Sequence, residues 1–487
     1  MSNNLKFFID GAWVDPVVAR RIKVIDPSTE ESFTEISGGS GADVDKAVAA
    51  AKAAFPSFSR TSKKERLELL QSCLAAYNER FDELAEICCR EMGAPISLAK
   101  EAQAFVGQAH FQALIDVFKS FNFTEMRGTT LVVKEAIGVV GLITPWNWPL
   151  NQIVCKVAPA LAGGNTMVLK PSEIAPINAI IFAEIMQKAG VPKGVFNLVN
   201  GDGPSVGQKL AEHRDVDMMS FTGSTRAGII VAKAAADTVK RVAQELGGKS
   251  ANILLEDVDL EDAVRKGVGA CFINGGQSCD AATRMLVPRK LHDRALQYAA
   301  AEADRQVTGD PHSDATALGP LVSQIQFDKV QRLIKVGIDE GATLAAGGLG
   351  RPGGLARGYY ARPTVFGNVT RDMTISRKEI FGPVLSIMPY DSEEEAVDIA
   401  NDTVYGLAAY VQSRDEARAR AVAARMRAGT VFINYPDPDF TAPFGGYKQS
   451  GNGREYADFA LNDFLEVKGI VGYGEAAAHG TDSKPPG

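Results

Sequence analysis

The chain has 487 residues, of which 45% are hydrophobic and 23% charged, and its formal net charge is −7 at pH 7. This length is enough for about two to four domains, each with a buried core. Lysines and arginines are scattered among acidic residues, so no basic stripe is available for a phosphate backbone, and we expect no nucleic-acid partner. The apolar run at 136–150 is interrupted by Asn and Pro well short of the ~20 residues that span a bilayer, so we expect no membrane segment.

The N-terminal stretch MSNNLKFFIDGAW lacks the basic start and apolar centre of a signal peptide. The six cysteines show no C-x-x-C spacing, and the five histidines form no cluster typical of a zinc site. Free thiols in a reducing compartment are the simplest interpretation. We therefore expect a cytoplasmic protein without a metal ion.

The first elements that the sequence predicts are strand-like stretches at FIDGAWV and IKVIDP, followed by a helix at VDKAVAAAKAAF. A capping box, Ser62-x-x-Glu65, starts a further helix, and apolar residues between 69 and 88 then recur at helical spacing. These helices carry no candidate active residues. We expect them to cover a sheet.

From about residue 137, short β-rich runs alternate with helical segments; the runs are VVGLIT, TMVLK, VFNLVN, MMSFTG and RVAQEL. Repeated strand–helix–strand units predict a parallel, doubly wound sheet. Ligands of such sheets bind beyond the carboxyl ends of the strands. Candidate site residues at these ends are Asn147, Lys170, Glu173 and Ser224.

A second α/β region is predicted from near Asn252 to about Lys448, with a helix at FDKVQRLIKVGIDE and a strand at VLSIMPY. Two stretches outside both regions, MRGTTLVVKEA and FLEVKGIVGYG, alternate like strands. We interpret them as a two-stranded arm that pairs between subunits. The last residues, 476–487, are expected to form a flexible tail.

Two glycine-rich stretches are candidates for dinucleotide binding. The first, VNGDGPSVG, has a spacing one residue longer than the usual fingerprint, and we interpret it as a turn and helix start. The second, FTGSTRAG, lies where a strand ends and a helix begins. Free backbone N–H groups there, with the Ser224 hydroxyl, are suited to a pyrophosphate. The alternative is a helix N-cap without a ligand.

Lys170 and Glu173 follow the strand TMVL in the stretch VLKPSE. A carboxylate at this place accepts hydrogen bonds from a ribose diol and repels a 2′-phosphate, which favours NAD over NADP. The alternative is an exposed salt bridge at the end of the strand.

Three segments suggest covalent chemistry. TPWNWP holds the amide of Asn147 in a rigid turn, suited to donating to an oxyanion. ELGGKS places Glu245 beside two glycines that leave room for substrate or water. GGQSCDAATR places Cys279 after a Gly-Gly turn, where we expect a helix start that lowers the pKa of the thiol. Each residue alone is commonly structural, but together they provide a nucleophile, a base and an oxyanion donor.

Seven motifs, in order along nearly the whole chain, resemble those of the NAD(P)-dependent aldehyde dehydrogenase superfamily. They are PWNWP (145–149), KPSE (170–173), FTGST (221–225), ELGGK (245–249), FINGGQSCDAATR (272–284), KEIFGPV (378–384) and PFGGYKQSGNGRE (443–455).

The resemblance implies that Cys279 is the nucleophile, that Asn147 and the Cys279 backbone N–H form the oxyanion hole, and that Glu245 is the general base. The cofactor site that it implies binds NAD, with NADP as the alternative. The residues assigned to this site are Lys170, Glu173, Ser224, Glu379, Phe381, Gln326, Trp146 and Gly223.

The fold that the resemblance implies is α/β, with a Rossmann-type cofactor domain, an α/β catalytic domain and a β-arm that builds homodimers or homotetramers. We assign 1–118 and 137–247 to the cofactor domain, 248–448 to the catalytic domain, and 119–136 and 460–475 to the arm.

The loop NYPDPDFTAPF is expected to line the substrate pocket, and it carries Asp437 and Asp439 but no Arg or Lys. A negatively charged substrate would need a cation to pair with, so we expect a neutral aliphatic or aromatic aldehyde. The residues assigned to the pocket are Trp148, Asn151, Cys155, Phe440 and Phe444.

Other interpretations are a semialdehyde dehydrogenase of a catabolic pathway, a catalytically silent structural relative, a coenzyme A-acylating dehydrogenase and a thiol hydrolase. The intact set of Asn147, Glu245 and Cys279 argues against a silent protein, and Glu245 argues against transfer to coenzyme A. A thiol hydrolase would give Glu173, Ser224 and Glu379 no role, and no motif contains a histidine.

Overall fold

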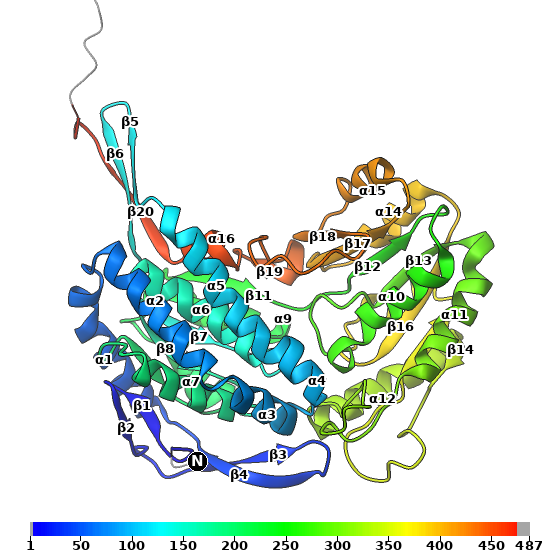
Figure 1. The fold of residues 1–487 in the computed structure, drawn as a ribbon, viewed down its shortest axis with the longest axis horizontal. Coiled ribbons are helices and arrows are strands. Elements are labelled where there is room, and N and C mark those ends of the chain that lie inside the picture. Colours follow the sequence, from blue (N-terminus) through cyan, green and yellow to red (C-terminus); the bar gives the residue numbers. More distant parts are fainter. Residues whose placement is uncertain (1–2, 475–487) are drawn as a thin grey trace, which may run out of the picture.

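A computed structural model of the chain describes residues 3–474, and the tail predicted at 476–487 lies outside them. Two large sheets, each covered by helices, form two lobes, and a narrow β-arm projects from the first lobe (Figure 1). Within the described residues, no helix is long and apolar enough to cross a membrane.

The sheet of the first lobe contains all five strands predicted between residues 137 and 247, and these pair in parallel as expected. Its order is β19-β11-β10-β7-β8-β9-β1-β2. The strands are β1 (Phe7–Ile9), β2 (Ala12–Val14), β7 (Val139–Ile143), β8 (Thr166–Lys170), β9 (Phe196–Leu198), β10 (Met218–Thr222), β11 (Arg241–Glu245) and β19 (Gly451–Asn452). From β7 the chain winds outward through β8 and β9, then crosses back to β10 and β11. The topological switch point therefore lies between β7 and β10.

Helices cover both faces of this sheet, as the sequence predicts. Alternate residues of β7 show this, because Val139 and Ile143 pack in one core while Val140 and Leu142 pack in another. The first core contains residues of α1 (Gly41–Phe58), α8 (Gln208–Glu212) and α9 (Thr225–Ala236). The second contains residues of α2 (Lys63–Asn78), α3 (Phe81–Met92), α5 (Phe105–Ser120), α6 (Pro149–Gly163) and α7 (Ile177–Lys188).

Local sequence sets several boundaries in this lobe. The predicted capping box is present, because Ser62 Oγ accepts from the Glu65 N–H and the Glu65 carboxylate accepts from the Ser62 N–H. The stretch VNGDGPSVG forms a turn and the single-turn π-helix η2 (Gly203–Gly207), as interpreted from its spacing. The remaining elements are the pair β3 (Arg21–Asp26) and β4 (Glu31–Ser37), α4 (Ile96–Leu98) and the π-helix η1 (Ala99–Ala104).

The second lobe is a seven-stranded sheet in the order β14-β15-β16-β13-β12-β17-β18, in which only the edge pair β14–β15 is antiparallel. Its strands are β12 (Ala251–Leu254), β13 (Arg284–Pro288), β14 (Thr343–Ala346), β15 (Thr364–Gly367), β16 (Val384–Tyr390), β17 (Ala408–Gln412) and β18 (Thr430–Ile433). Its helices are α10 (Leu260–Phe272), α11 (His292–Arg305), α12 (Gln324–Asp339), α13 (Thr374–Arg377), α14 (Glu393–Asn401) and α15 (Glu416–Ala423).

The arm has three strands rather than the two predicted. Residues 124–136 fold on themselves as β5 (Thr124–Arg127) and β6 (Thr130–Ala136), and β20 (Leu465–Ile470) pairs with β6. A hairpin forms because Gly128 adopts a φ of 60° at the turn, which a glycine tolerates without strain.

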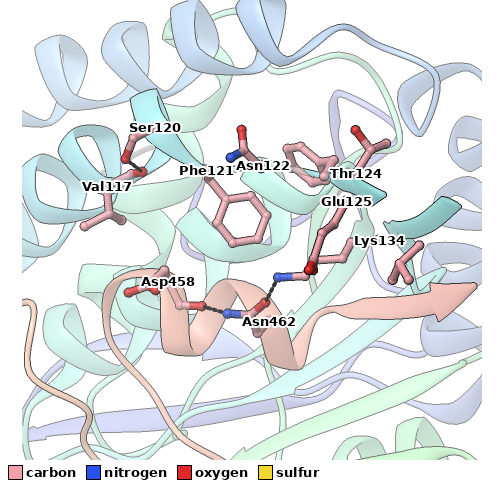
Figure 2. Close-up of a pocket in the computed structure, with 11 residues that line it drawn as sticks. Val117, Ser120, Phe121, Asn122, Thr124, Glu125, Lys134, Asp458 and Asn462 are labelled. Atoms are coloured by element: carbon pink, nitrogen blue, oxygen red, sulfur yellow. Dashed lines mark hydrogen bonds between the residues drawn. The ribbon is translucent and has the colours of Figure 1, made fainter. Parts of the chain in front are cut away.

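A hollow of about 540 Å³ lies at the root of the arm (Figure 2). Lys134 Nζ donates to Asn462 of α16 (Ala457–Asp463) at 2.8 Å, which ties β6 to the C-terminal helix. None of the predicted site residues lines this hollow. This hollow is therefore a feature of the arm and is not the predicted active site.

Candidate active site

A cavity of about 180 Å³ opens at the switch point of the first sheet. The loop after β7 and the loop after β10 both line it, as expected for a doubly wound sheet. Residues of the second lobe close its other side, so the cavity lies between the lobes. The predicted residues that line it are Trp146, Asn147, Gly223, Ser224, Cys279, Gln326, Glu379 and Phe381.

The loop after β7 forms hydrogen bonds with the residues just before Cys279. Asn147 Nδ2 donates to the carbonyl of Gln277 at 3.1 Å, and Trp148 Nε1 donates to Ser278 Oγ at 2.8 Å. In return, Asn274 Nδ2 donates to the carbonyl of Asn147 at 2.9 Å. These bonds fix the Asn147 amide close to the Cys279 backbone.

The expected helix start at Cys279 is wrong. Cys279 lies in a turn between η3, a 3₁₀ segment (Ile273–Gly276), and β13. Asn274, Gly275 and Gly276 have φ values of 55°, 63° and 70°, and such a left-handed run cannot begin an α-helix.

Gly276 is needed because it approaches the backbone of another loop closely. A Cβ on Gly276 would collide with the carbonyl of Gly382 and lie 2.8 Å from the nitrogen of Pro383. Gly276 therefore allows the Cys279 loop to pack directly on the backbone after Phe381.

The pKa of Cys279 is raised well above its ordinary value, which corrects the expectation of a lowered pKa. Burial is the main cause, and the nearby carboxylates of Asp280, Glu379 and Glu245 add to it. The backbone N–H of Cys279 lowers the pKa, but no helix N-terminus adds to that effect. The raised pKa favours the neutral thiol over the thiolate.

Exposure separates Cys279 from the other cysteines. All six are free, but Cys73, Cys88, Cys89, Cys155 and Cys271 are buried, whereas Cys279 is partly exposed. The cavity is thus accessible to one thiol only.

The two glycines after Glu245 allow close contacts on both sides of the site. A Cβ on Gly248 would collide with the carbonyl of Cys279, and a Cβ on Gly247 would lie 2.7 Å from the Glu379 carboxylate. The Gly248 N–H donates to that carboxylate at 3.0 Å. The stretch ELGGK therefore positions both Cys279 and Glu379.

The Glu245 carboxyl is buried beside Gly445, and neither oxygen has a hydrogen-bonding partner. Its pKa is raised well above the ordinary value, first by burial and then by the charge of Glu455, while Lys156 and Arg454 oppose the shift. Glu245 does not line the cavity described above. In this conformation it faces the buried ion pair of Lys156 with Glu455.

Glu379 and Phe381 sit on a loop held by α12. Gln326 Nε2 donates to the carbonyls of Ile380 and Phe381 at 3.2 and 2.6 Å. The Phe381 ring meets Trp146 edge to face, with 5.4 Å between the ring centroids. A carboxylate next to two aromatic rings is suited to a ribose with an attached planar ring.

Several residues that line the cavity were not identified in the sequence analysis. Lys329 lies 5.9 Å from the centroid of the Phe381 ring and follows Gln326 by three residues on α12, so helical spacing was a usable signal. The other missed residues are Pro145, Thr222, Leu246 and Gly247, which all stand inside or beside recognised motifs.

Lys170, Glu173 and Ser224 lie at the carboxyl ends of β8 and β10, as predicted. Lys170 Nζ and Glu173 Oε2 form an ion pair of 3.1 Å, and Ser224 Oγ accepts from the Ala227 N–H at the start of α9. The salt bridge is thus present but partly buried rather than exposed, and Ser224 forms the N-cap contact. Neither contact prevents the same atoms from binding a ligand, because Glu173 is partly exposed and Ser224 is exposed.

Three of the residues assigned to the substrate pocket, Trp148, Asn151 and Cys155, recur at helical spacing at the start of α6. Asn151 Nδ2 contacts the Tyr456 hydroxyl at 3.4 Å, and Phe444 stacks on Tyr456 with 5.0 Å between centroids. The sequence missed Tyr456 and also His110, which packs against Phe440.

Comparison with known proteins identifies the family of this chain. The sequence model of the aldehyde dehydrogenase family matches residues 13–470. A 3-succinoylsemialdehyde-pyridine dehydrogenase from a Pseudomonas species is 55% identical over 97% of this chain and 99% of its own length. A putative aldehyde dehydrogenase from Staphylococcus aureus is 49% identical over 97% of this chain and all of its own length.

A solved structure extends the agreement to three dimensions. A cysteine-to-alanine mutant of aldehyde dehydrogenase C from Pseudomonas syringae, in complex with NAD+ and octanal, superposes with a TM-score of 0.97 and is 52% identical, covering 98% of each chain. The chain belongs to the aldehyde dehydrogenase family.

Proposed function

We propose that this protein oxidises an aldehyde to the carboxylic acid with NAD, through a thiohemiacetal and then a thioester on Cys279. The observation that carries the proposal is the shared cavity, in which Cys279 and Asn147 lie beside Glu379, Phe381 and Ser224. A nucleophile, an oxyanion donor and groups suited to a dinucleotide thus meet at one place.

The residues of the cavity fit the nicotinamide end of NAD. Glu379 offers a carboxylate to the ribose hydroxyls, while Trp146 and Phe381 offer apolar surface to the ring. Ser224 and the N-terminus of α9 suit the pyrophosphate, and Lys170 with Glu173 suit the adenosine ribose. Bound NAD supplies the acceptor for the hydride that leaves the aldehyde carbon. The NAD+ in the Pseudomonas syringae structure supports this choice.

Cys279 provides the nucleophile. Because its pKa is raised, its proton must pass to a base as the sulfur attacks the aldehyde carbon. The oxygen of the resulting thiohemiacetal then carries the negative charge. Asn147 Nδ2 has two N–H groups, and since only one is used by Gln277, the other can donate to this oxyanion together with the Cys279 backbone N–H.

We assign to Glu245 the role of the base that activates water to hydrolyse the thioester. Its side chain must turn from the Lys156–Glu455 pair toward Cys279 to do so. Burial keeps its carboxyl protonated to a higher pH than usual, whereas Lys156 and Arg454 favour the carboxylate. Above its raised pKa, Glu245 is therefore a carboxylate that can accept a proton from water.

We propose a neutral aliphatic or aromatic aldehyde as substrate. The aromatic rings of Phe440, Phe444 and Tyr456 are suited to such a group, and the octanal in the Pseudomonas syringae structure is neutral. A semialdehyde dehydrogenase of a catabolic pathway is the second candidate. The name of the Pseudomonas relative favours it, and that name also describes an aldehyde bearing a pyridine ring.

The test is NADH absorbance with the purified protein, NAD, and a panel of octanal, benzaldehyde and succinic semialdehyde, with and without coenzyme A. We expect NADH and the free acid from octanal and benzaldehyde, with no requirement for coenzyme A. A catalytically silent relative would form no NADH with any aldehyde. A far higher kcat/KM for succinic semialdehyde would contradict the neutral substrate.

We also propose a homodimer or homotetramer assembled through the arm. Among residues 3–474, neither outer strand of the arm, β5 or β20, has a partner on its outer edge, and β20 exposes every residue after Leu465. Light scattering should give a multiple of 52.0 kDa, and a monomer would contradict the proposal. The six free cysteines support the prediction of a cytoplasmic location.

A further inference from the structure

Gln103 is a fully buried glutamine that contacts the backbone of Asn147. It belongs to η1, the π-helical segment that joins α4 to α5 in one continuous helical stretch. Its Nε2 atom donates to the carbonyl oxygen of Asn147 at 3.0 Å and to Asn274 Oδ1 at 3.3 Å. Gln103 does not line the cavity. Any effect that it has on the reaction therefore passes through the residues that it holds.

Asn147, Asn274 and Gln277 form a closed ring of hydrogen bonds. Asn274 Nδ2 donates to the carbonyl of Asn147 at 2.9 Å and to that of Gln277 at 3.3 Å. Asn147 Nδ2 donates to the same Gln277 carbonyl at 3.1 Å. Gln103 supplies the second donor to the Asn147 carbonyl, whose two lone pairs are then both used. Asn147 is thus held by its side chain and by its backbone.

Two features of Gln103 are unusual in a helix. π-Helical turns are rare, and they occur frequently at functional sites. Among residues 3–474, no group donates to Gln103 Oε1 although this oxygen is buried, and an unpaired buried oxygen destabilises a fold. Tyr77 fixes the end of the π-helical segment, since its buried hydroxyl donates to the Ala104 carbonyl at 2.7 Å. A methionine would fill the same space without the unpaired oxygen, so the N–H groups are what a glutamine adds here.

We infer that Gln103 is a positioning residue for the oxyanion donor Asn147. This inference rests on the proposed function, in which the free N–H of the Asn147 amide donates to the thiohemiacetal oxygen. Gln103 and Asn274 fix the carbonyl of Asn147, and this limits the movement of the amide on the same residue. A displacement of about 1 Å in a catalytic group can lower a rate by about 100-fold. Binding of NAD and of the aldehyde does not depend on either contact.

The test measures the first-turnover rate of NADH formation from octanal by stopped-flow absorbance, divided by the concentration of NAD-binding sites. Gln103→Met keeps the length of the side chain but removes the amide. It should lower this rate about tenfold. The Kd for NAD and the octanal concentration that gives half of the maximal rate should change less than twofold.

Gln412→Met is the matched control. Gln412 is likewise a buried glutamine whose Nε2 donates to an asparagine oxygen, Asn252 Oδ1 at 3.1 Å, and it does not line the cavity. Its first-turnover rate should equal that of wild type. Asn274→Gly removes the other donor to the Asn147 carbonyl, while glycine tolerates the φ of 55° at this position, and this variant should also lower the rate.

A double-mutant cycle with Asn147→Ala separates positioning from general damage to the site. Because Gln103 acts through the Asn147 amide, adding Gln103→Met to Asn147→Ala should lower the remaining rate by less than about twofold. An unchanged rate in Gln103→Met, or the same fold loss with and without the Asn147 amide, would overturn the inference alone. If Gln103→Met does not bind NAD, Asn274→Gly in the two backgrounds decides in the same way. Absence of NADH from the wild-type protein with octanal, benzaldehyde and succinic semialdehyde would overturn the proposed function.

Discussion

Asn147 and Gln277 are joined by a hydrogen bond of 3.1 Å, from the side-chain amide of the first to the backbone carbonyl of the second. The bond connects the loop after β7 in one lobe to the Cys279 turn in the other. It leaves the second N–H of the amide free, and it holds that N–H near the Cys279 backbone. The oxyanion site that we propose is therefore assembled by contact between the lobes.

Replacing Asn147 by alanine should lower kcat for octanal by about 100- to 1000-fold, because one oxyanion donor is lost. The affinity for NAD, measured by fluorescence titration, should change little and serves as the control. A kcat close to that of wild type would show that Asn147 does not stabilise the oxyanion.

Replacing Glu245 by glutamine should separate the two halves of the reaction. We expect a rapid burst of NADH followed by slow turnover, because the thioester forms but water is not activated. In the wild-type protein the raised pKa of Glu245 means that the carboxylate forms at higher pH than usual, so steady-state kcat should increase as pH rises through that pKa. Stopped-flow absorbance across this range checks both points. A variant without a burst, or one with the same pH profile as wild type, would contradict the role of Glu245.

Replacing Glu173 by glutamine should weaken the preference for NAD over NADP. The carboxylate repels a 2′-phosphate, and the amide does not. We expect the ratio of kcat/KM for the two cofactors to fall about tenfold, mainly through KM for NADP. Glu184→Gln is a control in which the ratio should stay constant, since Glu184 lies on the largely buried helix α7 and pairs with Arg80 away from the cofactor site. An unchanged ratio in Glu173→Gln would remove Glu173 from the cofactor site.

The parallel strands of the first lobe were predictable because both their apolar runs and the residues that end these runs are local features of the sequence. The runs around β7, β8 and β10 are short and apolar, and each ends in a motif. The arm was harder to predict, because the pairing of β20 with β6 joins segments more than 300 residues apart. Sequence alternation reveals such strands but not how many of them meet.

The candidate site shows the same contrast between features set by local sequence and features set by long-range packing. Motifs identified Asn147, Glu379 and Cys279, which line one cavity. They did not identify His110 or Tyr456, because neither residue stood in a stretch whose chemistry was recognised and only the packing of α5 on the C-terminal segment brings them together. The raised pKa of Cys279 could not be predicted from the sequence either, because it depends on burial and on neighbouring carboxylates.

Replacing Gly276 by alanine should destabilise the fold by about 1–3 kcal/mol, because the new Cβ collides with the carbonyl of Gly382. Gly190→Ala is a matched control. Gly190 has a similar φ of 81°, but no atom lies within 4 Å of its Cβ position, so this variant reports backbone strain alone. Urea unfolding of the two variants measures the difference. Equal losses of stability would show that the close packing on Gly382 is unimportant.

The measurement that tests the central claim most directly is NADH formation from octanal by Cys279→Ala beside Cys271→Ala. Cys271 lies eight residues earlier on α10, is buried, and does not line the cavity. We predict no NADH above background from Cys279→Ala, with NAD still bound, and substantial turnover from Cys271→Ala. Sustained NADH formation by Cys279→Ala would contradict the assignment of Cys279 as the nucleophile.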